Sequence, residues 1–315
     1  MPTTQSAFAE LAERHRRELH VHCYRMLGSF EEGEDLVQET LLRAWRSRAD
    51  LERKEWFRAW AYKIATNACL DKIKRDGRRL PSLGSFRDVP WLQPYPDRLL
   101  EEIAPAEEEP DAALLARETI ELTFVAVIQL LPPRQRAVLI LRDVLDWPAA
   151  KVADLLELSV PAVNSALQRA RATLREQLPP GRCEDWASPD MSESERELLA
   201  GFIDTHERGD TEAALALISD DIRITMPPNP MLYEGRPAVA ALMARAFEDE
   251  SLGEWRLVPI RANRQPAAAS YLRRPGETTF HAFKIDVLRV ADGRIAEITT
   301  FGSALFAAFG LRATL

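Results

Sequence analysis

The chain has 315 residues, 46% of them hydrophobic and 29% charged, a composition that suits a globular protein of two or three domains. It has no run of about 18 apolar residues, and its first ten residues lack the cationic start and apolar stretch of a signal peptide. We therefore expect a cytoplasmic protein. Its three cysteines, Cys23, Cys69 and Cys183, lie far apart without a CxxC pair, which argues against a disulfide framework or a zinc site. No metal or other cofactor is expected.

The formal net charge of −8 conceals an alternation of basic and acidic segments. Residues 1–80 carry a net charge of +3 and residues 119–182 a net charge of +2. Residues 81–118 carry a net charge of −6 and residues 183–315 one of −7. Binding to polyanionic nucleic acid favours basic surfaces. The distribution therefore predicts two modules suited to nucleic acid, separated by acidic parts with other roles.

Two helical segments between Glu34 and Arg79 carry different chemistry. The first begins with an acidic run, which suits a helix N-terminus, and its apolar residues recur at helical spacing. The second is rich in aromatic residues and ends in a basic run, a combination that suits stacking on bases beside phosphates. Aromatic residues at this spacing are more often part of a core, so the pattern alone leaves both interpretations open. With a preceding helix over Ser6–Leu27, these segments predict a helical bundle over residues 6–80.

Residues 81–117 are expected to form an acidic linker, because six prolines in this stretch exclude a long helix. The linker contains the apolar segment WLQPYP. Exposure of this much apolar surface is unfavourable, so the segment is expected to dock on another part of the chain.

Residues 118–178 predict a second helical module with a helix-turn-helix. Its paired helices are expected over Trp147–Glu157 and Val160–Leu174, and Ser159 is placed to cap the second one. This second helix presents polar and basic side chains of the kind that bond bases and phosphates. A further linker is expected over residues 179–192.

The segments DLVQETLLRAW and FRAWAYKIATNACLD resemble region two of the extracytoplasmic-function (ECF) sigma factors of bacterial RNA polymerase. The helix-turn-helix, at its distance from them, resembles region four of the same family, and no region three lies between, as is typical of the ECF group. The resemblance implies binding to promoter DNA and to core RNA polymerase, at the clamp helices of β′ and the flap of β. The implied polymerase-binding residues are Asp35, Gln38, Glu39, Leu42 and Arg43.

The same resemblance implies two surfaces that read DNA. Asn67 matches a family position that holds a base flipped out of the −10 element, and Trp60 matches one that supports strand separation. An Asn side chain pairs with a base edge through a donor and an acceptor, and a stacking surface offsets the cost of unstacking a base. The implied −10 residues are Trp56, Trp60, Lys63, Asn67, Asp71 and Lys74, and the implied −35 residues are Ser159, Pro161, Asn164, Ser165, Gln168, Arg169, Arg171 and Arg175.

Residues 193–315 are not part of a minimal sigma factor. Helical patterns are followed by several strand patterns, the last two joined by the turn Ala291-Asp292-Gly293. This order predicts an α+β cone closed around a pocket. The stretch ALISDDIRITMPPNPMLYEGRPAVAALM resembles the SnoaL-like polyketide-cyclase family, a relative of ketosteroid isomerase. The expected helices are Ser194–Arg208, a short one starting at Thr211 and ending at Ile218, and Ala238–Phe247, and the expected strands are Asp221–Met226, Glu254–Asn263, Ala268–Arg274, Thr279–Val290 and Arg294–Phe301.

The pocket of this cone is expected to be aromatic. Strict alternation along the strand Thr279–Val290 places His281 inward, on the same face as Phe283, and places Asp286 on the opposite face. An enzyme of this superfamily needs a base together with a hydrogen-bond donor for an enolate, and the sequence shows no clear pair. We therefore expect a sensory or docking domain with room for a small ligand. The candidate pocket residues are Tyr233, Trp255, Tyr271, His281 and Phe283.

These patterns predict a multidomain protein with two all-α sigma modules, the region two bundle and the region four helix-turn-helix, and a C-terminal α+β cone over residues 193–315. The predicted function is that of an ECF sigma factor that has no enzymatic activity and is regulated in cis by its cone. Two alternatives stay open. One is a bifunctional protein whose SnoaL-like domain acts on a small ligand. The other is a ligand-responsive DNA-binding regulator that works without polymerase, against which the DLVQETLLRAW surface argues.

Overall fold

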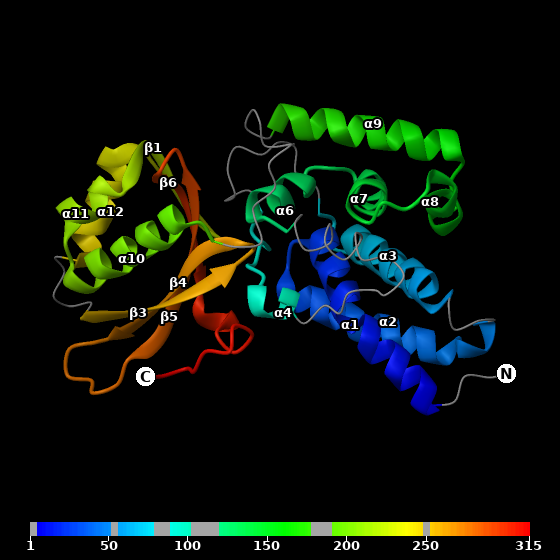
Figure 1. Cartoon of the computed structure of the whole chain (residues 1–315), viewed down its shortest axis with the longest axis horizontal. Helices are drawn as coiled ribbons and strands as arrows, with labels where there is room; N and C mark the ends of the chain where they lie inside the picture. The colour runs from blue at the N-terminus through cyan, green and yellow to red at the C-terminus, as the bar shows by residue number, and fades with distance from the viewer. Residues whose placement is uncertain (1–4, 52–55, 79–88, 102–119, 178–190, 248–252) are drawn as a thin grey trace. The chain divides into compact units, whose positions relative to one another are not determined.

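The computed structural model describes residues 5–51, 56–78, 89–101, 120–177, 191–247 and 253–315 (Figure 1). The chain divides into two compact units. The first unit combines Met1–Leu83 with Leu99–Trp186, and the second combines Gly84–Arg98 with Ala187–Leu315. Among the described residues, no helix is both long enough and apolar enough to cross a membrane. Of the expected linkers over 81–117 and 179–192, residues 81–88, 102–117 and 179–190 lie outside the described residues.

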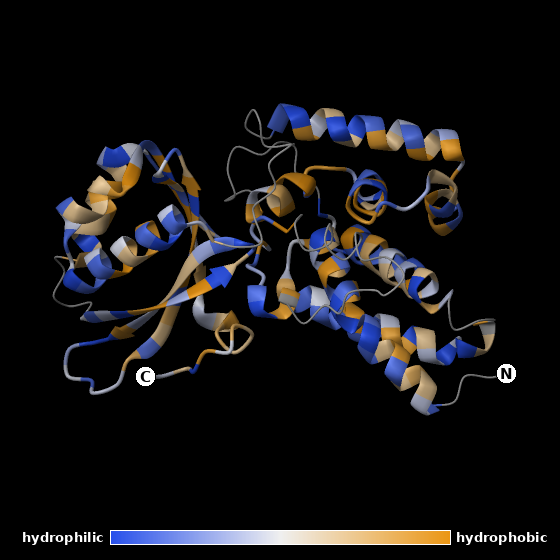
Figure 2. Cartoon of the chain, in the orientation of Figure 1, coloured by the Kyte–Doolittle hydropathy of each residue, from blue (hydrophilic) through white to orange (hydrophobic). Residues whose placement is uncertain are grey.

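Three helices form the bundle at the start of the first unit. Helix α1 ends at Gly28, whose φ of 73° is a left-handed conformation that favours glycine. The Ser29 hydroxyl then accepts a hydrogen bond from the Glu32 amide at 3.4 Å and so caps α2. Buried aromatic and aliphatic residues come from all three helices. Along each helix, hydrophobic residues alternate with hydrophilic ones (Figure 2). The helices are α1 (Gln5–Leu27), α2 (Phe30–Arg46) and α3 (Phe57–Arg75), with a 3-10 turn η1 over Arg48–Asp50.

The second half of the first unit contains the predicted helix-turn-helix. Glu157 ends its first helix with a φ of 55°, and the Ser159 hydroxyl accepts a hydrogen bond from the Ala162 amide at 3.3 Å, as expected of a cap. The preceding helix ends at Ile128, and Pro132 disfavours helical backbone at Leu131 before it. The elements are α6 (Leu122–Ile128), α7 (Pro133–Leu139), a π-helical turn η4 (Ile140–Val144), α8 (Ala149–Leu156) and α9 (Val160–Gln177).

The second unit is a curved six-stranded sheet with helices on its concave face (Figure 1). The strand order is β2-β1-β6-β5-β4-β3, in which only the β1–β6 pair is parallel. The predicted α+β order of elements is confirmed, and the sequence missed only the edge strand β2 among the described strands. The elements are α10 (Glu193–Arg208), α11 (Thr211–Ala216), β1 (Ile218–Met226), β2 (Asn229–Glu234), α12 (Gly235–Phe247), β3 (Glu254–Ala262), β4 (Gln265–Arg273), β5 (His281–Ala291), β6 (Arg294–Gly302) and η5 (Ser303–Leu305).

The apolar segment of the first linker docks on the tip of the β3–β4 hairpin. The Tyr95 amide donates to Oδ1 of Asn263 at 2.7 Å, and the Asn263 amide donates to the Tyr95 carbonyl at 2.9 Å. Oδ1 of Asp97, at the start of α4 (Asp97–Glu101), accepts from the Arg264 amide at 2.9 Å. Tyr95 is fully buried, as is Leu92. The expectation that this segment docks is therefore confirmed, and its partner is the cone.

Candidate functional site

The predicted polymerase-binding residues lie along one exposed side of α2. Leu42 is 58% exposed, which is unusual for a leucine in a well-packed bundle. Glu39 and Arg43 form an ion pair of 2.5 Å on the same side. Asp35 and Gln38 are also exposed, whereas the opposite side of the helix is buried. The helix therefore has a face that its own bundle does not cover.

The predicted −10 residues follow one stripe of α3 and of the residue before it. Trp56 is 50% exposed, and Asn67, Asp71 and Lys74 are exposed at helical spacing below it. Trp60 and Lys63 are half-buried. Lys63 lies 3.6 Å from the carboxylate of Glu157 at the end of α8, so this basic side chain meets an acidic one from the second helical module. The opposite face of α3 is buried, in contrast to this stripe. Its buried residues include Phe57, Ala61, Tyr62, Ala65, Ala68, Cys69 and Ile73.

The predicted −35 residues lie on α9 and on the residue before it. They differ in whether their side chains are hydrogen-bonded to other residues of the module. Arg171 forms two hydrogen bonds with Asp143, at 2.7 and 2.8 Å, which hold its guanidinium against the module. The guanidinium of Arg169 donates to the Ser165 hydroxyl at 2.6 Å. The remaining members are exposed without such a bond to a neighbouring helix: Ser159, Pro161, Asn164, Gln168 and Arg175.

A buried arginine joins the two helical modules within the first unit. Arg136 on α7 is 2% exposed, and its guanidinium donates to the Met26 carbonyl in the last turn of α1. It also donates to Oε1 and the carbonyl of Gln129, at 2.6 and 2.7 Å, and to the Leu131 carbonyl at 3.3 Å. Burial lowers the pKa of Arg136 to about 9, and the nearby charge of Arg78 adds to this effect. The cation lies at the negative end of the α1 dipole, which favours it there.

Three further contacts join the two helical modules. Nε2 of Gln129 donates to the Arg25 carbonyl at 3.2 Å, and the Gln129 side chain packs so close to Gly28 that a Cβ at Gly28 would lie 3.1 Å from it. The Tyr62 ring of α3 meets the Trp147 ring edge-on, with 5.1 Å between centroids. These contacts, with the ion pair at Lys63, hold the second module against α1 and α3 in this conformation.

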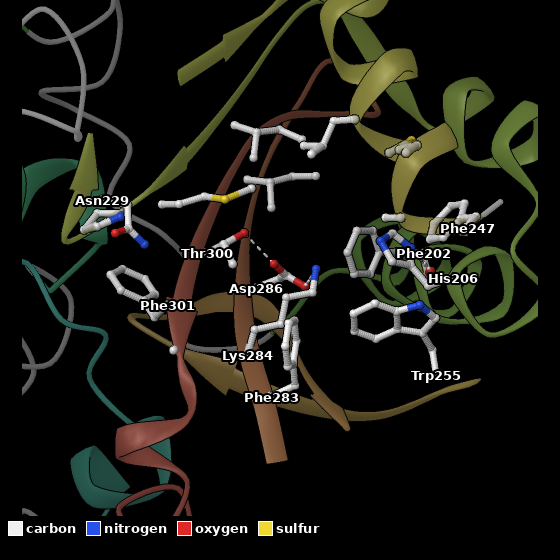
Figure 3. Close-up of a pocket in the computed structure, with 18 of the residues that line it drawn as sticks. Phe202, His206, Asn229, Phe247, Trp255, Phe283, Lys284, Asp286, Thr300 and Phe301 are labelled. Atoms are coloured by element: carbon white, nitrogen blue, oxygen red, sulfur yellow. Dashed lines mark hydrogen bonds and ion pairs between the residues drawn. The ribbon is translucent and has the colours of Figure 1, made fainter. Parts of the chain in front are cut away.

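The cone encloses a cavity of about 410 Å³ between its helices and the concave face of the sheet (Figure 3). Phe202, His206, Phe247 and Trp255 gather at one end, and Asn229 and Phe301 lie at the other (Figure 3). Most of the wall is apolar. The remaining wall residues are Ile224, Met226, Pro227, Pro228, Leu242, Met243, Ala246, Phe283, Lys284, Asp286, Ile298, Thr300 and Gly302.

An ion pair lies between the two ends of the cavity (Figure 3). The Lys284 ammonium is 2.8 Å from Oδ2 of Asp286, and Oδ1 of Asp286 accepts a hydrogen bond from the Thr300 hydroxyl at 2.6 Å. Asp286 is fully buried, which is tolerable because its charge is paired and bonded. The polar centre of the cavity is therefore neutral overall.

Of the five candidate pocket residues, the structure places Trp255 and Phe283 on the cavity wall. The expectation that His281 lines the pocket is wrong: its side chain is 56% exposed, and it is not on the cavity wall. Tyr271 is buried on the other face of the sheet, where its hydroxyl donates to the Arg312 carbonyl at 2.9 Å. Tyr233 packs against the core cluster instead of the cavity.

A β-bulge in β5 reverses the predicted alternation between His281 and Asp286. Ser270 of β4 pairs with Lys284, but the next residue, Tyr271, pairs with Ala282, so that Phe283 is the extra residue on β5. A bulge reverses the alternation of side chains beyond it. The predicted outward orientation of Asp286 is therefore also wrong, since Asp286 lies on the cavity wall. His206, which the sequence did not assign to the pocket, follows Phe202 by four residues, and this helical spacing is the signal that would have placed both on one inward stripe.

Comparisons with known proteins assign both helical modules and the cone to known families. Three family models match the chain: Sigma-70 region 2 over residues 11–79, Sigma-70, region 4 over residues 122–174, and a SnoaL-like domain over residues 199–298. The chain is 40% identical over 318 residues to ECF RNA polymerase sigma factor SigG of Mycobacterium tuberculosis, covering 96% of this chain and 84% of the relative. The chain therefore belongs to the ECF family of RNA polymerase sigma factors.

Two further comparisons agree with this membership. ECF RNA polymerase sigma factor SigW of Bacillus subtilis is 27% identical over 55% of this chain and 90% of its own length, so it matches the sigma modules without the cone. The crystal structure of the sigma factor SigJ of Mycobacterium tuberculosis superposes with a TM-score of 0.61 at 19% identity, covering 96% of this chain and 99% of the other. The likeness to SigJ shows that the whole three-part fold is shared.

The Arg136 contact gives a first prediction. Arg136→Met removes the guanidinium and leaves the carbonyls of Met26, Gln129 and Leu131 buried without this donor. A buried acceptor left unsatisfied costs about 1–3 kcal/mol, so the free energy of unfolding in urea should fall by at least about 2 kcal/mol. Arg134→Met is the matched control, because Arg134 is exposed on the same helix and should change the value by less than about 0.5 kcal/mol. Equal unfolding curves for the two variants would contradict a structural role for the buried cation.

Proposed function

We propose that this chain docks on core RNA polymerase through the exposed face of α2 and reads promoter DNA with α3 and α9. The observation that carries the proposal is that three helices of one unit each present a polar or aromatic face that the unit leaves uncovered. On α2 that face includes the apolar Leu42, which suits a protein partner. On α3 it combines Trp56 with Asn67 and Lys74, which suits an unpaired strand.

The packing of the two modules implies that they separate when both promoter elements are bound. The −10 and −35 elements lie roughly 85 Å apart along B-form DNA, at about 3.4 Å per base pair. In this structure Lys63, in the −10 stripe, lies 3.6 Å from Glu157, just before the −35 helix α9. Helices that touch cannot occupy both elements. We therefore assign the observed conformation to the free protein and the separated one to the promoter complex.

The cone is proposed to control this transition in cis. Tyr95 and Asp97 lie in the only chain connection between the two helical modules, and both are bonded to the hairpin of the cone. A cone that holds this connection restricts how far the modules can separate. Tethering gives an effective concentration of roughly millimolar, so a weak contact is populated. The sigma-factor relatives that match most of the chain support a regulatory cone over a catalytic one.

The base-capture role of Asn67 is tested by promoter opening. Asn67→Ala removes a side chain that meets DNA only after a base has been extruded, so it should impair opening more than initial duplex binding. Arg175→Ala is the matched variant on the −35 helix, and it should weaken duplex binding and lower the slope of log affinity against log salt by about 1. Permanganate footprinting and filter binding measure the two steps. If the Asn67→Ala protein opens the promoter normally, Asn67 does not hold an extruded base.

The polymerase-binding role of α2 is tested by charge reversal. Glu39→Arg replaces the ion pair with Arg43 by a repulsion of a few tenths of a kcal/mol, which leaves the fold nearly unchanged. Co-purification with core polymerase should nevertheless be lost. Asp154→Arg, at an exposed position on α8, is the control that should still co-purify. If Glu39→Arg binds polymerase normally, or if it melts far below the parent protein, this face of α2 is not the docking surface.

Control by the cone is tested by run-off transcription. Removal of residues 183–315 should change the yield, and Asn263→Gly should reproduce part of the change, because it deletes the Oδ1 acceptor for the Tyr95 amide while glycine suits the φ of 55°. Asp292→Gly is the control, since Asp292 is exposed in another hairpin of the cone with a φ of 50°. Equal transcription by the full-length, truncated and Asn263→Gly proteins at every salt concentration would exclude cis control.

A further inference from the structure

The aromatic end of the cone cavity is built around a histidine. The His206 ring lies 3.9 Å from the Phe202 ring centroid and meets the Phe247 ring edge-on at 5.0 Å. Trp255 and Phe283 meet edge-on at 5.3 Å on the cavity wall. Such ring surfaces are complementary to a flat, apolar molecule. The cavity volume of about 410 Å³ falls within the range of small-molecule sites.

The protonation state of His206 follows from its surroundings. Burial lowers the pKa of His206 to about 4, and the nearby ammonium of Lys284 adds to this effect, so the ring is neutral at pH 7. Nδ1 lies 2.9 Å from the Phe202 carbonyl, which can only accept, so Nδ1 carries the proton. Nε2 is then an unprotonated acceptor. In the part of the chain that the structure describes, no residue donates a hydrogen bond to it.

A donor with spare capacity lies on the wall of the same cavity. The Lys284 ammonium, which has three N–H groups, is 2.8 Å from Asp286 and 5.6 Å from the centre of the Trp255 ring. An acceptor and a donor in an apolar wall are the kind of polar groups that fix the orientation of a ligand.

From these features we propose that the cone binds a neutral, planar, hydroxylated aromatic molecule, whose hydroxyl donates to Nε2 of His206 and whose oxygen accepts from Lys284. The ligand is expected to be neutral because of the charges on the cavity wall. Lys284 and Asp286 already compensate each other, so a charged ligand would lose its hydration without gaining a free counterion. Binding of the ligand requires the cavity alone. Only the effect of binding on transcription rests on the proposed regulatory role of the cone.

The same geometry favours binding over catalysis. A general base works best when its pKa lies near the working pH. His206, with a pKa of about 4, is a weak base at pH 7. The other candidate, Asp286, is held by the Lys284 ammonium and the Thr300 hydroxyl on its two oxygens. Neither group is placed to remove a proton from carbon efficiently, so the bound molecule is expected to leave unchanged.

Calorimetric titration of the full-length protein with three probes of one ring system tests the proposal. 2-Naphthol offers a hydroxyl donor, 2-methoxynaphthalene keeps the rings and the oxygen without the donor, and 2-naphthoate is an anion. We expect 2-naphthol to bind roughly five- to tenfold more tightly than 2-methoxynaphthalene, the worth of one hydrogen bond, and 2-naphthoate to bind least. Equal affinity for the first two probes, preference for the anion, or binding of none of the three would overturn the proposal.

Variants of the full-length protein assign the preference to His206. His206→Phe should bind 2-naphthol and 2-methoxynaphthalene alike, while His206→Gln, which keeps an acceptor, should restore part of the preference. His281→Phe is the control outside the cavity and should retain it fully. Circular dichroism confirms that each variant is folded. A full preference in a folded His206→Phe protein would contradict the assignment. If 2-naphthol binds selectively but transcription is unchanged, the binding site stands and cis control is excluded. If no probe binds but truncation alters transcription, cis control stands and the binding site is excluded.

Discussion

The conformation of the helical unit depends on one buried cation. Arg136 is surrounded by carbonyl oxygens and the amide of Gln129, and no carboxylate is among the hydrogen-bond acceptors of its guanidinium. Removing such a group from water is costly, and its hydrogen bonds to the end of α1 recover that cost only while the two modules stay packed. The contact therefore stabilises the packed arrangement of the two modules. When the modules separate, water readily solvates the Arg136 guanidinium. This is a property that suits a factor whose two DNA-reading modules must first be held and then released.

In the proposed function, the linker connects the cone to the equilibrium between packed and separated modules. The hairpin tip that receives the linker is formed by Asn263 and Arg264, which both have positive φ, so their amides point outward to Tyr95 and Asp97. A ligand shifts an equilibrium only by the difference in its affinity for the two states. The cavity and the hairpin lie on one sheet, so a ligand that changes the packing of β3 and β4 alters the surface that holds the linker. In the proposed function, recognition of DNA and recognition of a small molecule are linked through one short segment.

Sequence reasoning succeeded where the signal is local and failed where it is not. The exposed stripes of α2 and α3 follow from helical periodicity, and the caps at Ser29, Ser159 and Asp210 hold their helices where such residues are expected. The inward faces of β5 could not be predicted, because one extra residue at Phe283 reverses the alternation and carries no distinctive sequence mark. The role of Arg136 was equally hidden, since its acceptor at Met26 is 110 residues away.

The most direct test of the account is a distance between the two modules in the free protein and in the promoter complex. Spin labels at Glu31→Cys and Asp154→Cys, both exposed, with Cys183→Ser to avoid labelling there, report the separation of α2 from α8 by electron–electron resonance. The account predicts one short distance in the free protein and an increase of tens of ångströms with core polymerase and promoter DNA, because the two elements lie roughly 85 Å apart. The same short distance in a transcriptionally active complex would contradict it.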